Sequence, residues 1–180
     1  MKLEIKHLAG YLSYSLKVLD EEYGKTFEVC SYRQDSEEWM IYDDIDGSVE
    51  EYSRDILKPI LHPLSDLTKE IEVNGEKFVP IVEIGKMFDF DNLERFELDD
   101  DIIEYGFSQH YADDSQGFSF GYFENGSFGL WCDEIDDSHP ISEYCRLDVI
   151  QKLYEWHFDV YNLIENYLAI DINTLKIKKL

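Results

Sequence analysis

The chain has few basic residues and no long apolar run. It holds 16 Lys and Arg against 40 Asp and Glu among 180 residues, a formal net charge of -24. So many carboxylates repel phosphate backbones and anionic lipids over a Debye length of about 8 Å. No apolar run approaches the roughly 20 residues of a membrane-spanning helix, and the opening MKLEIKHL lacks the apolar core of a secretion signal. We therefore expect a cytoplasmic protein that contacts neither nucleic acid directly nor a membrane.

Cysteine and proline are also scarce. The three cysteines, Cys30, Cys132 and Cys145, are odd in number and show no Cys-x-x-Cys spacing, which argues against a disulfide framework and a thiolate zinc site. We expect reduced, mostly packed thiols. The 44% of hydrophobic residues and only four prolines exclude the composition of a disordered chain. A chain of this length buries roughly 70% of its unfolded surface, which is enough for a hydrophobic core.

From about residue 14 to residue 53, apolar and polar residues alternate in four short runs. The runs are SYSLKVL, TFEVCSY, EEWMIYD and SVEEYS, and turn signals separate them at Gly24 and at Asp46-Gly47. This spacing predicts a small antiparallel meander.

The next run, LKPILHPLSDL at 57–67, contains Pro59 and Pro63. Proline cannot donate to a strand ladder, so we expect no central strand here and at most a short helix that begins near Pro63. We place a boundary in this run. It divides a β-meander lobe, residues 1–57, from an α+β lobe, residues 58–180, unless the two form one continuous domain.

Two Asn-Gly pairs, Asn74-Gly75 and Asn125-Gly126, predict hairpins, because both residue types tolerate the positive φ of a type I′ turn. A two-residue loop fixes the pairing of each hairpin. The first then pairs Val73 with Glu76, Glu72 with Lys77 and Ile71 with Phe78, and the second pairs Phe123 with Phe128, Gly121 with Leu130 and Phe120 with Trp131.

From about Ile141 to Leu168, apolar residues recur at steps of three and four, which predicts one long helix of roughly six turns. The run AIDINTLKI after it suits a final strand. The expected fold class is α+β. It has an antiparallel sheet with two Asn-Gly hairpins, an N-terminal β-meander lobe and one long C-terminal helix.

No known catalytic, cofactor-binding or metal-binding pattern occurs in the sequence. There is no GxSxG elbow, no HExxH and no phosphate-binding glycine loop. On the expected helix, His157 points away from Glu155 and Asp159, so the three form no acid/base cluster, and a hydrogen-bonded core histidine is the better interpretation. His110 beside Asp113 and Asp114 suits an exposed ion pair better than a metal site.

A calcium loop at 42–53 would need carboxylates at both ends. It has Tyr42 and Ser53 there, so a hairpin turn is the better interpretation. We assign no catalytic residue, cofactor or metal ligand. An enzyme with an unrecognised site assembled from distant residues stays open as an alternative.

Acidic residues gather at 35–55, 89–104 and 133–137. One interpretation is a solvated surface that maintains solubility, and the other is a surface that imitates the phosphate array of nucleic acid. Composition does not separate them. The leading function is a non-enzymatic protein-binding module with an unknown and possibly basic protein partner, and the first alternative is an acidic nucleic-acid mimic that inhibits a DNA- or RNA-binding or defence protein.

Two sets of residues are candidates for that interaction. An exposed aromatic face of the second hairpin would use apolar contacts, whereas the acidic run before it would use charge. The candidates are Phe120, Tyr122 and Trp131 on the hairpin and Asp99, Asp100 and Asp101 in the acidic run.

Three segments carry a resemblance: LAGYLSYSLKV at 8–18, ILKPILHPLSDLTKEIEVNGEKFVPI at 56–81 and KLYEWHFDVYNLIENYLAIDINTL at 152–175. They resemble an uncharacterised protein family of gut anaerobes and their phages and prophages. The chain departs from it at Gly10 and Ser13, where other members often have proline. The resemblance implies no catalytic residue. It implies a mobile-element origin and a role in phage replication, assembly or host defence.

Overall fold

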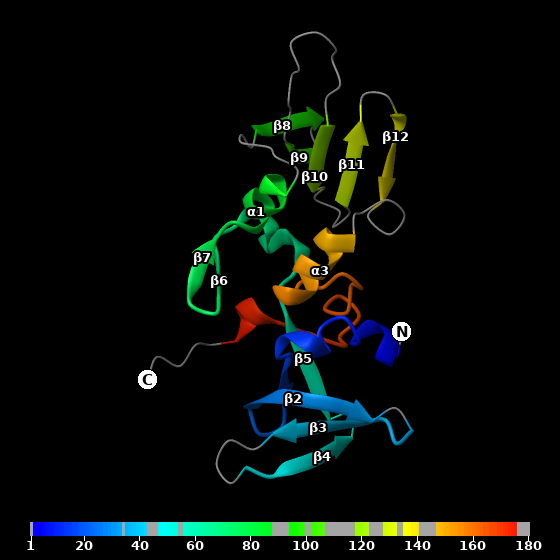
Figure 1. Ribbon diagram of the computed structural model, residues 1–180, viewed down its shortest axis with the longest axis vertical. Coiled ribbons are helices and arrows are strands. Elements are labelled where there is room, and N and C mark those ends of the chain that lie inside the picture. Colours follow the sequence, from blue (N-terminus) through cyan, green and yellow to red (C-terminus); the bar gives the residue numbers. More distant parts are fainter. Residues whose placement is uncertain are drawn as a thin grey trace. The chain divides into compact units, whose positions relative to one another are not determined.

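The computed structural model shows a mixed α+β protein with a mainly antiparallel sheet (Figure 1). For the strands between residues 94 and 140 it describes the backbone alone. The described residues are 2–33, 35–42, 47–53, 56–87, 94–99, 102–106, 118–122, 128–132, 135–140 and 147–175.

The chain divides into two compact units. Unit 1 comprises Met1–Pro63 and Gln151–Leu180, and unit 2 comprises Leu64–Ile150. The end of the chain therefore belongs with the N-terminal strands, and the proline-containing run that we place at a lobe boundary contributes its first half to the same unit.

Unit 1 is built on a six-stranded sheet in the order β13-β5-β1-β2-β3-β4. The predicted meander is confirmed, because β1 to β4 pair in chain order and antiparallel. β3 and β4 pair antiparallel from Tyr42–Val49 to Glu38–Ser53, the pairing expected of a hairpin, while residues 43–46 of the supposed calcium loop lie outside the described residues. The strands are β1 Lys17–Asp20, β2 Lys25–Arg33, β3 Glu38–Tyr42, β4 Val49–Ser53, β5 Leu57–Leu61 and β13 Ile170–Asp171.

Alternation along the meander strands sorts their side chains onto two faces. Val29, Trp39 and Ile41 are buried in the core, whereas Tyr42 beside them in sequence is exposed. Cys30 lies where the β2–β3 register shifts between Val29 and Ser31, and it is an exposed free thiol. The expectation of a packed thiol is therefore wrong for Cys30, because it follows the inward-facing Val29 and so lies on the opposite face of the strand.

The expectation that Pro59 excludes a central strand is wrong. Pro59 lies in β5, opposite Val18 of β1, and β5 has strands on both sides. Its second neighbour, β13, is only two residues long and pairs in parallel with Ile60 and Leu61. Pro59 thus lies beyond the end of the β13 ladder, where its missing N–H breaks no pair. A short 3-10 helix, η3 Leu64–Thr68, does follow Pro63.

The N-terminal residues close the core of unit 1 with two 3-10 helices, η1 Ile5–His7 and η2 Leu12–Tyr14. Buried residues from this segment, from the sheet and from the chain end form one cluster. Its members are Leu3, Leu8, Tyr11, Leu16, Val18, Val29, Trp39, Ile41, Leu57, Leu61, Leu163 and Ala169.

The expected long C-terminal helix is wrong in its extent: α3 is Leu147–Glu155, and residues 141–146 lie outside the described residues. The helix ends in a Schellman motif, in which the N–H of Phe158 bonds to the carbonyl of Leu153 and the N–H of His157 to that of Tyr154. His157 takes the left-handed position, with φ 57°. Turns follow, and then β13 and a last 3-10 helix, η4 Ile172–Thr174.

Apolar side chains stay on a helical period through these turns. The carboxylate of Asp159 accepts hydrogen bonds from the N–H groups of Leu163 and Ile164, and a second Schellman motif ends at Tyr167, with φ 60°. Short helical turns separated by left-handed residues therefore bury Leu163 much as one long helix would.

Unit 2 begins with η3 and a short hairpin. β6 Ile71–Val73 and β7 Glu76–Phe78 pair antiparallel, with Ile71 opposite Phe78, Glu72 opposite Lys77 and Val73 opposite Glu76. Asn74 and Gly75 between them have φ 54° and 84°. The helix α1, Pro80–Lys86, begins with proline at its first turn, which suits a helix start, and buries Ile81 and Ile84.

The rest of unit 2 consists of strands: β8 Glu94–Asp99, β9 Ile102–Gly106, β10 Phe118–Tyr122, β11 Phe128–Cys132 and β12 Ile135–Pro140. The expected register of the second hairpin is wrong by one residue, since Gly121 lies opposite Gly129 rather than Leu130. Phe123 lies outside the described residues, and five residues rather than two separate the strands. In the observed register, apolar residue types lie opposite one another. The pairs are Phe118 with Cys132, Phe120 with Leu130 and Tyr122 with Phe128.

Candidate functional site

The residues that the sequence selects for binding lie in unit 2. They are Phe120 and Tyr122 on β10, Trp131 on β11, Asp99 at the end of β8, and Asp100 and Asp101. Asp100 and Asp101 lie outside the described residues, and no side chain of the other four is described. Residues 89–93 and 133–134 of the acidic regions, together with His110, Asp113, Asp114 and Cys145, also lie outside them. A grouping of these residues on one surface stays a prediction.

Unit 1 contains a buried junction between the start of the chain, the end of β5 and the segment after α3. We call the following set the junction: Tyr11, His62, His157, Phe158 and Asp159. The Tyr11 hydroxyl donates to the Phe158 carbonyl at 2.6 Å and accepts from the Val160 N–H at 3.3 Å. The His62 N–H donates to the His157 carbonyl at 2.8 Å, and the Asp159 N–H donates to the His62 carbonyl at 2.9 Å. Backbone groups from distant segments thus satisfy one another.

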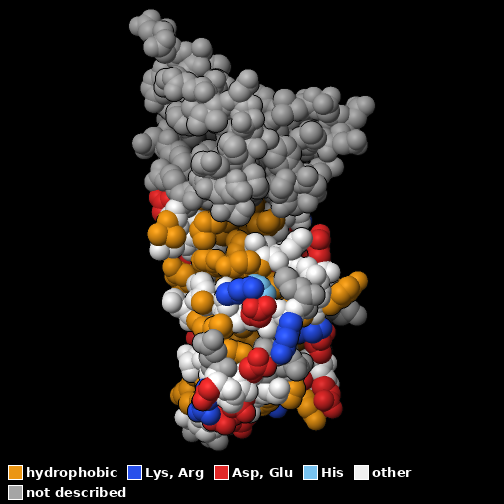
Figure 2. Space-filling model, turned by 90° about the vertical axis from the view of Figure 1, so that its right-hand side faces the viewer, with side chains coloured by type: hydrophobic (Ala, Val, Ile, Leu, Met, Phe, Trp, Pro, Cys, Tyr) orange, Lys and Arg blue, Asp and Glu red, His pale blue; other side chains and the backbone are white. Residues whose placement is uncertain are grey.

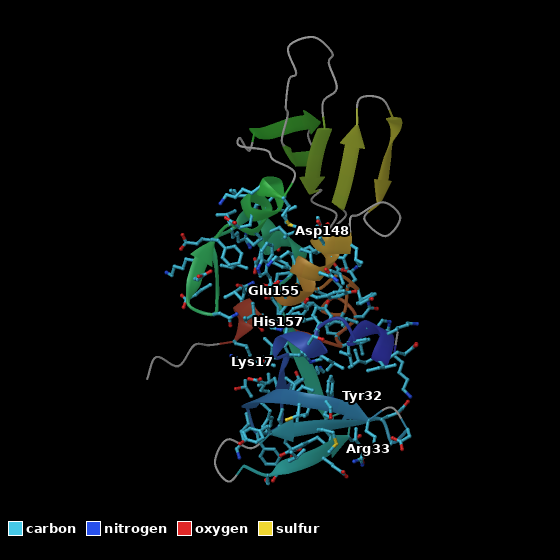
Figure 3. The ribbon with its side chains drawn as sticks, in the orientation of Figure 1. Lys17, Tyr32, Arg33, Asp148, Glu155 and His157 are labelled. Atoms are coloured by element: carbon cyan, nitrogen blue, oxygen red, sulfur yellow. The ribbon has the colours of Figure 1, made fainter. Side chains whose placement is uncertain are left out.

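The sequence predicts His157 as a hydrogen-bonded core histidine, and in the structure it is half-buried and hydrogen-bonds to the Tyr14 backbone. Figure 3 labels it directly after α3, and its buried Nε2 atom has no hydrogen-bond partner among the described residues. Burial lowers the pKa of His157, and a hydrogen bond with the Tyr14 backbone acts in the opposite direction. The ring is therefore neutral near pH 7.

Asp159 uses both carboxylate oxygens on the backbone. Oδ1 accepts from Leu163 N–H and Oδ2 from Ile164 N–H, each at 2.8 Å. Burial raises the pKa of Asp159, while these hydrogen bonds act against the rise. Glu155 pairs instead with Lys152 at 2.8 Å. Glu155, His157 and Asp159 therefore form no acid/base cluster, as we expected, although the helix that we invoked ends before His157.

Two tyrosines pack at the side of the junction. The Tyr154 ring meets Tyr11 edge-on with centroids 4.8 Å apart, and its hydroxyl lies 3.0 Å from that of Tyr161. A Cβ atom on Gly10 would lie 2.5 Å from the Tyr154 ring, so the backbone there admits no side chain. Burial raises the pKa of Tyr11 and Tyr154, which keeps both hydroxyls protonated. The junction serves packing and backbone hydrogen bonding, and its geometry suggests no reaction.

The opposite end of the same sheet is open. β4 is its last strand, and among the described strands it pairs only with β3. We call β4, residues 49–53, the outer edge. Four of its five residues are exposed, and Tyr52 is half-buried.

The sheet surface that faces away from the core runs across β2, β3 and β4, and we call it the outer face. Tyr42 lies opposite Val49, and their side chains are 46% and 52% exposed. Two residues along, Met40 lies opposite Glu51, and Arg33 of β2 reaches the Glu51 carboxylate at 2.9 Å (Figure 3). The outer face therefore combines an exposed apolar pair with charged groups.

The acidic region 35–55 is partly neutralised where it is described. Arg33 also approaches Glu38 at 3.7 Å, and Lys2 approaches Glu37 at 3.5 Å. On the visible surface in Figure 2, described basic side chains lie next to acidic ones. Because of these ion pairs, the described part of this region is not a continuous array of negative charges.

Sequence reasoning includes β4 in the meander but does not single it out as the exposed edge of the sheet. A usable signal exists, because a meander places its last strand at the sheet edge unless a later segment pairs with it. The junction has no such signal, since its contacts join residues about 150 positions apart.

Among the described residues, no group of three or more His, Cys, Asp and Glu side chains could hold a metal ion. Within the same part of the chain, no helix has the length and apolar character needed to cross a membrane. No protein-family model, curated protein or solved structure matches the chain.

Proposed function

We propose that the chain is a non-enzymatic protein-binding module that binds its partner through the outer end of the unit 1 sheet. The observation that carries the proposal is the exposed pair Tyr42 and Val49 beside a strand with a neighbour on one side only. Exposed aromatic and aliphatic groups rimmed by charge are typical of protein interfaces.

The resemblance to proteins of phages and prophages suggests where the partner belongs. It supports a partner in phage replication, assembly or host defence inside the bacterial cell. The net charge of -24 favours a basic protein, because opposite charge steers association.

Nucleic-acid mimicry is a weaker proposal for the described surface. A mimic needs carboxylates in a continuous array, whereas Arg33 is shared by Glu38 and Glu51 on the outer face. Mimicry through the acidic region 89–104 stays an alternative that the next experiment includes.

The test uses the purified full chain as bait in extracts of lysogenic or infected bacteria. Each captured protein is then purified, and its binding to the chain is measured by calorimetry. The first variant, Tyr42→Ala with Val49→Ser, removes the exposed apolar pair. Its control is Tyr167→Ala, because Tyr167 is 82% exposed elsewhere in unit 1.

We expect the first variant to weaken binding at least about tenfold, the loss typical of an interface hot spot, with the Tyr167→Ala control unchanged. Two further variants test the alternatives. Loss only with Tyr122→Ala and Trp131→Ala would move the surface to the β10–β11 hairpin. Loss only with Asp99→Lys, Asp100→Lys and Asp101→Lys would support the mimic.

A further inference from the structure

The outer edge lacks most devices that keep sheet edges from pairing with other chains. Short strands, bulges, prolines and charged side chains, lysine above all, are the usual devices. β4 has five residues without proline or lysine, its register with β3 is continuous from Glu38–Ser53 to Tyr42–Val49, and its only charges are Glu50 and Glu51. The opposite edge strand, β13, has only two residues. Among the described strands of unit 1, β4 is therefore the better template for an added strand.

The two glutamates of β4 determine which strand can add. Glu50 and Glu51 are consecutive and exposed, so they project to opposite faces of the sheet. In an antiparallel pair of two β4 strands in any central register, glutamates lie opposite or next to glutamates. Like charges across a pair are destabilising, which disfavours a second copy of this chain.

Among the described residues, each of these carboxylates has a partner at one oxygen and none at the other. Arg33 contacts Oε1 of Glu51, and the Tyr52 hydroxyl donates to Oε2 of Glu50 at 2.9 Å. A carboxylate accepts at both oxygens, so the remaining oxygen of each can accept from an incoming cation. β4 itself contains no Lys or Arg that would repel that cation.

We propose, building on the proposed function, that β4 accepts an extended segment of the partner as a seventh strand. That segment carries two consecutive basic residues opposite Glu50 and Glu51, one for each face, and an apolar residue opposite Val49, which extends the apolar pair that Val49 forms with Tyr42. Backbone hydrogen bonds supply the pairing, and the alternating side chains supply selectivity.

The test uses synthetic peptides as probes and the full chain as receptor. The first probe is a blocked hexapeptide with Lys-Arg at its centre and Thr-Val and Val-Thr around it. The second has the same sequence with every backbone amide N-methylated, which keeps the charge but prevents strand pairing from either edge. The third has Glu-Glu in place of Lys-Arg. Each peptide is titrated into the chain, and binding is measured from the NMR shifts of the chain's backbone amide resonances.

We expect the first peptide to bind and shift β4 amides, and the other two to bind at least about tenfold more weakly. Glu50→Gln with Glu51→Gln should weaken the first peptide roughly threefold to tenfold. The matched control, Glu21→Gln with Glu22→Gln, neutralises two consecutive exposed glutamates outside the strands and should have no effect.

Equal binding of the N-methylated peptide, or equal weakening by the control variant, would overturn strand addition. The proposed function fails separately. If a captured partner depends on Tyr42 and Val49 but is indifferent to Glu50→Gln with Glu51→Gln, the protein-binding module stands and the seventh strand is wrong.

Discussion

Polar groups are buried and hydrogen-bonded at one end of the unit 1 sheet, and they are exposed to solvent at the other end. At the junction, the Tyr11 hydroxyl and the His62 backbone bond to the backbone of distant segments, and the Asp159 carboxylate accepts from the nearby N–H groups of Leu163 and Ile164. At the outer edge, β4 has strand pairing on one side, and its glutamates are exposed. Chemically suggestive residues at the junction thus support the fold, whereas the ordinary edge strand β4 is the element that we propose to bind a partner.

The largest effect on stability should come from a substitution in the buried core next to the junction. Leu153 is fully buried on α3, so Leu153→Ala should lower the free energy of unfolding by about 2 to 5 kcal/mol. Leu147→Ala in the same helix is the control, because Leu147 is 72% exposed and should change stability by less than about 0.5 kcal/mol. Chemical denaturation measures both, and equal losses would show that the assigned burial is wrong.

A smaller loss should follow from cutting one bond of the junction. Tyr11→Phe keeps the buried ring but leaves the Phe158 carbonyl and the Val160 N–H without the hydroxyl. The Phe158 carbonyl and the Val160 N–H still bond to each other at 3.0 Å. The loss should therefore be about 0.5 to 1.5 kcal/mol, the net contribution of a typical hydrogen bond. Tyr23→Phe, at an exposed position, should be neutral. If denaturation midpoints of the two variants agree, the hydroxyl does not hold the junction together.

The smallest effect concerns pH. Burial lowers the pKa of His157 and of His7 below their ordinary value of 6.5, so the folded state binds these protons less well than the unfolded state. Their contribution is complete above that value and decreases as pH falls below it. Asp159, whose pKa is raised from 3.8, acts in the opposite direction at lower pH.

His157→Asn tests the sign, because asparagine tolerates the left-handed backbone at this position and does not titrate. The free energy of unfolding of the wild type should decrease more between pH 7.5 and 5.5 than that of the variant. His7 is present in both proteins and cancels in the comparison. An identical decrease in the two would remove His157 from the pH response.

The same contrast explains what the sequence could predict. The meander follows from alternation within runs of five to nine residues, and its last strand becomes the outer edge. The junction depends on pairing between His62 and residues 157–159, which interrupts the helical pattern without any glycine or proline. Local periodicity cannot reveal that interruption, because Leu163 is buried by turns or by helix alike. Pro59 led to a wrong prediction for a similar reason. β5 can include this proline because β13 is too short to pair with it, and the length of β13 is not visible in the sequence around Pro59.

Backbone amide hydrogen exchange of the free chain tests the central contrast most directly. The account predicts that amides of β5 exchange only through global unfolding, whereas those β4 amides that do not pair with β3 exchange by local opening. Adding the Lys-Arg peptide should slow exchange in β4 and leave β5 unchanged. Protection of every β4 amide in the free chain at the level of β5 would contradict the account, because the outer edge would then already be covered.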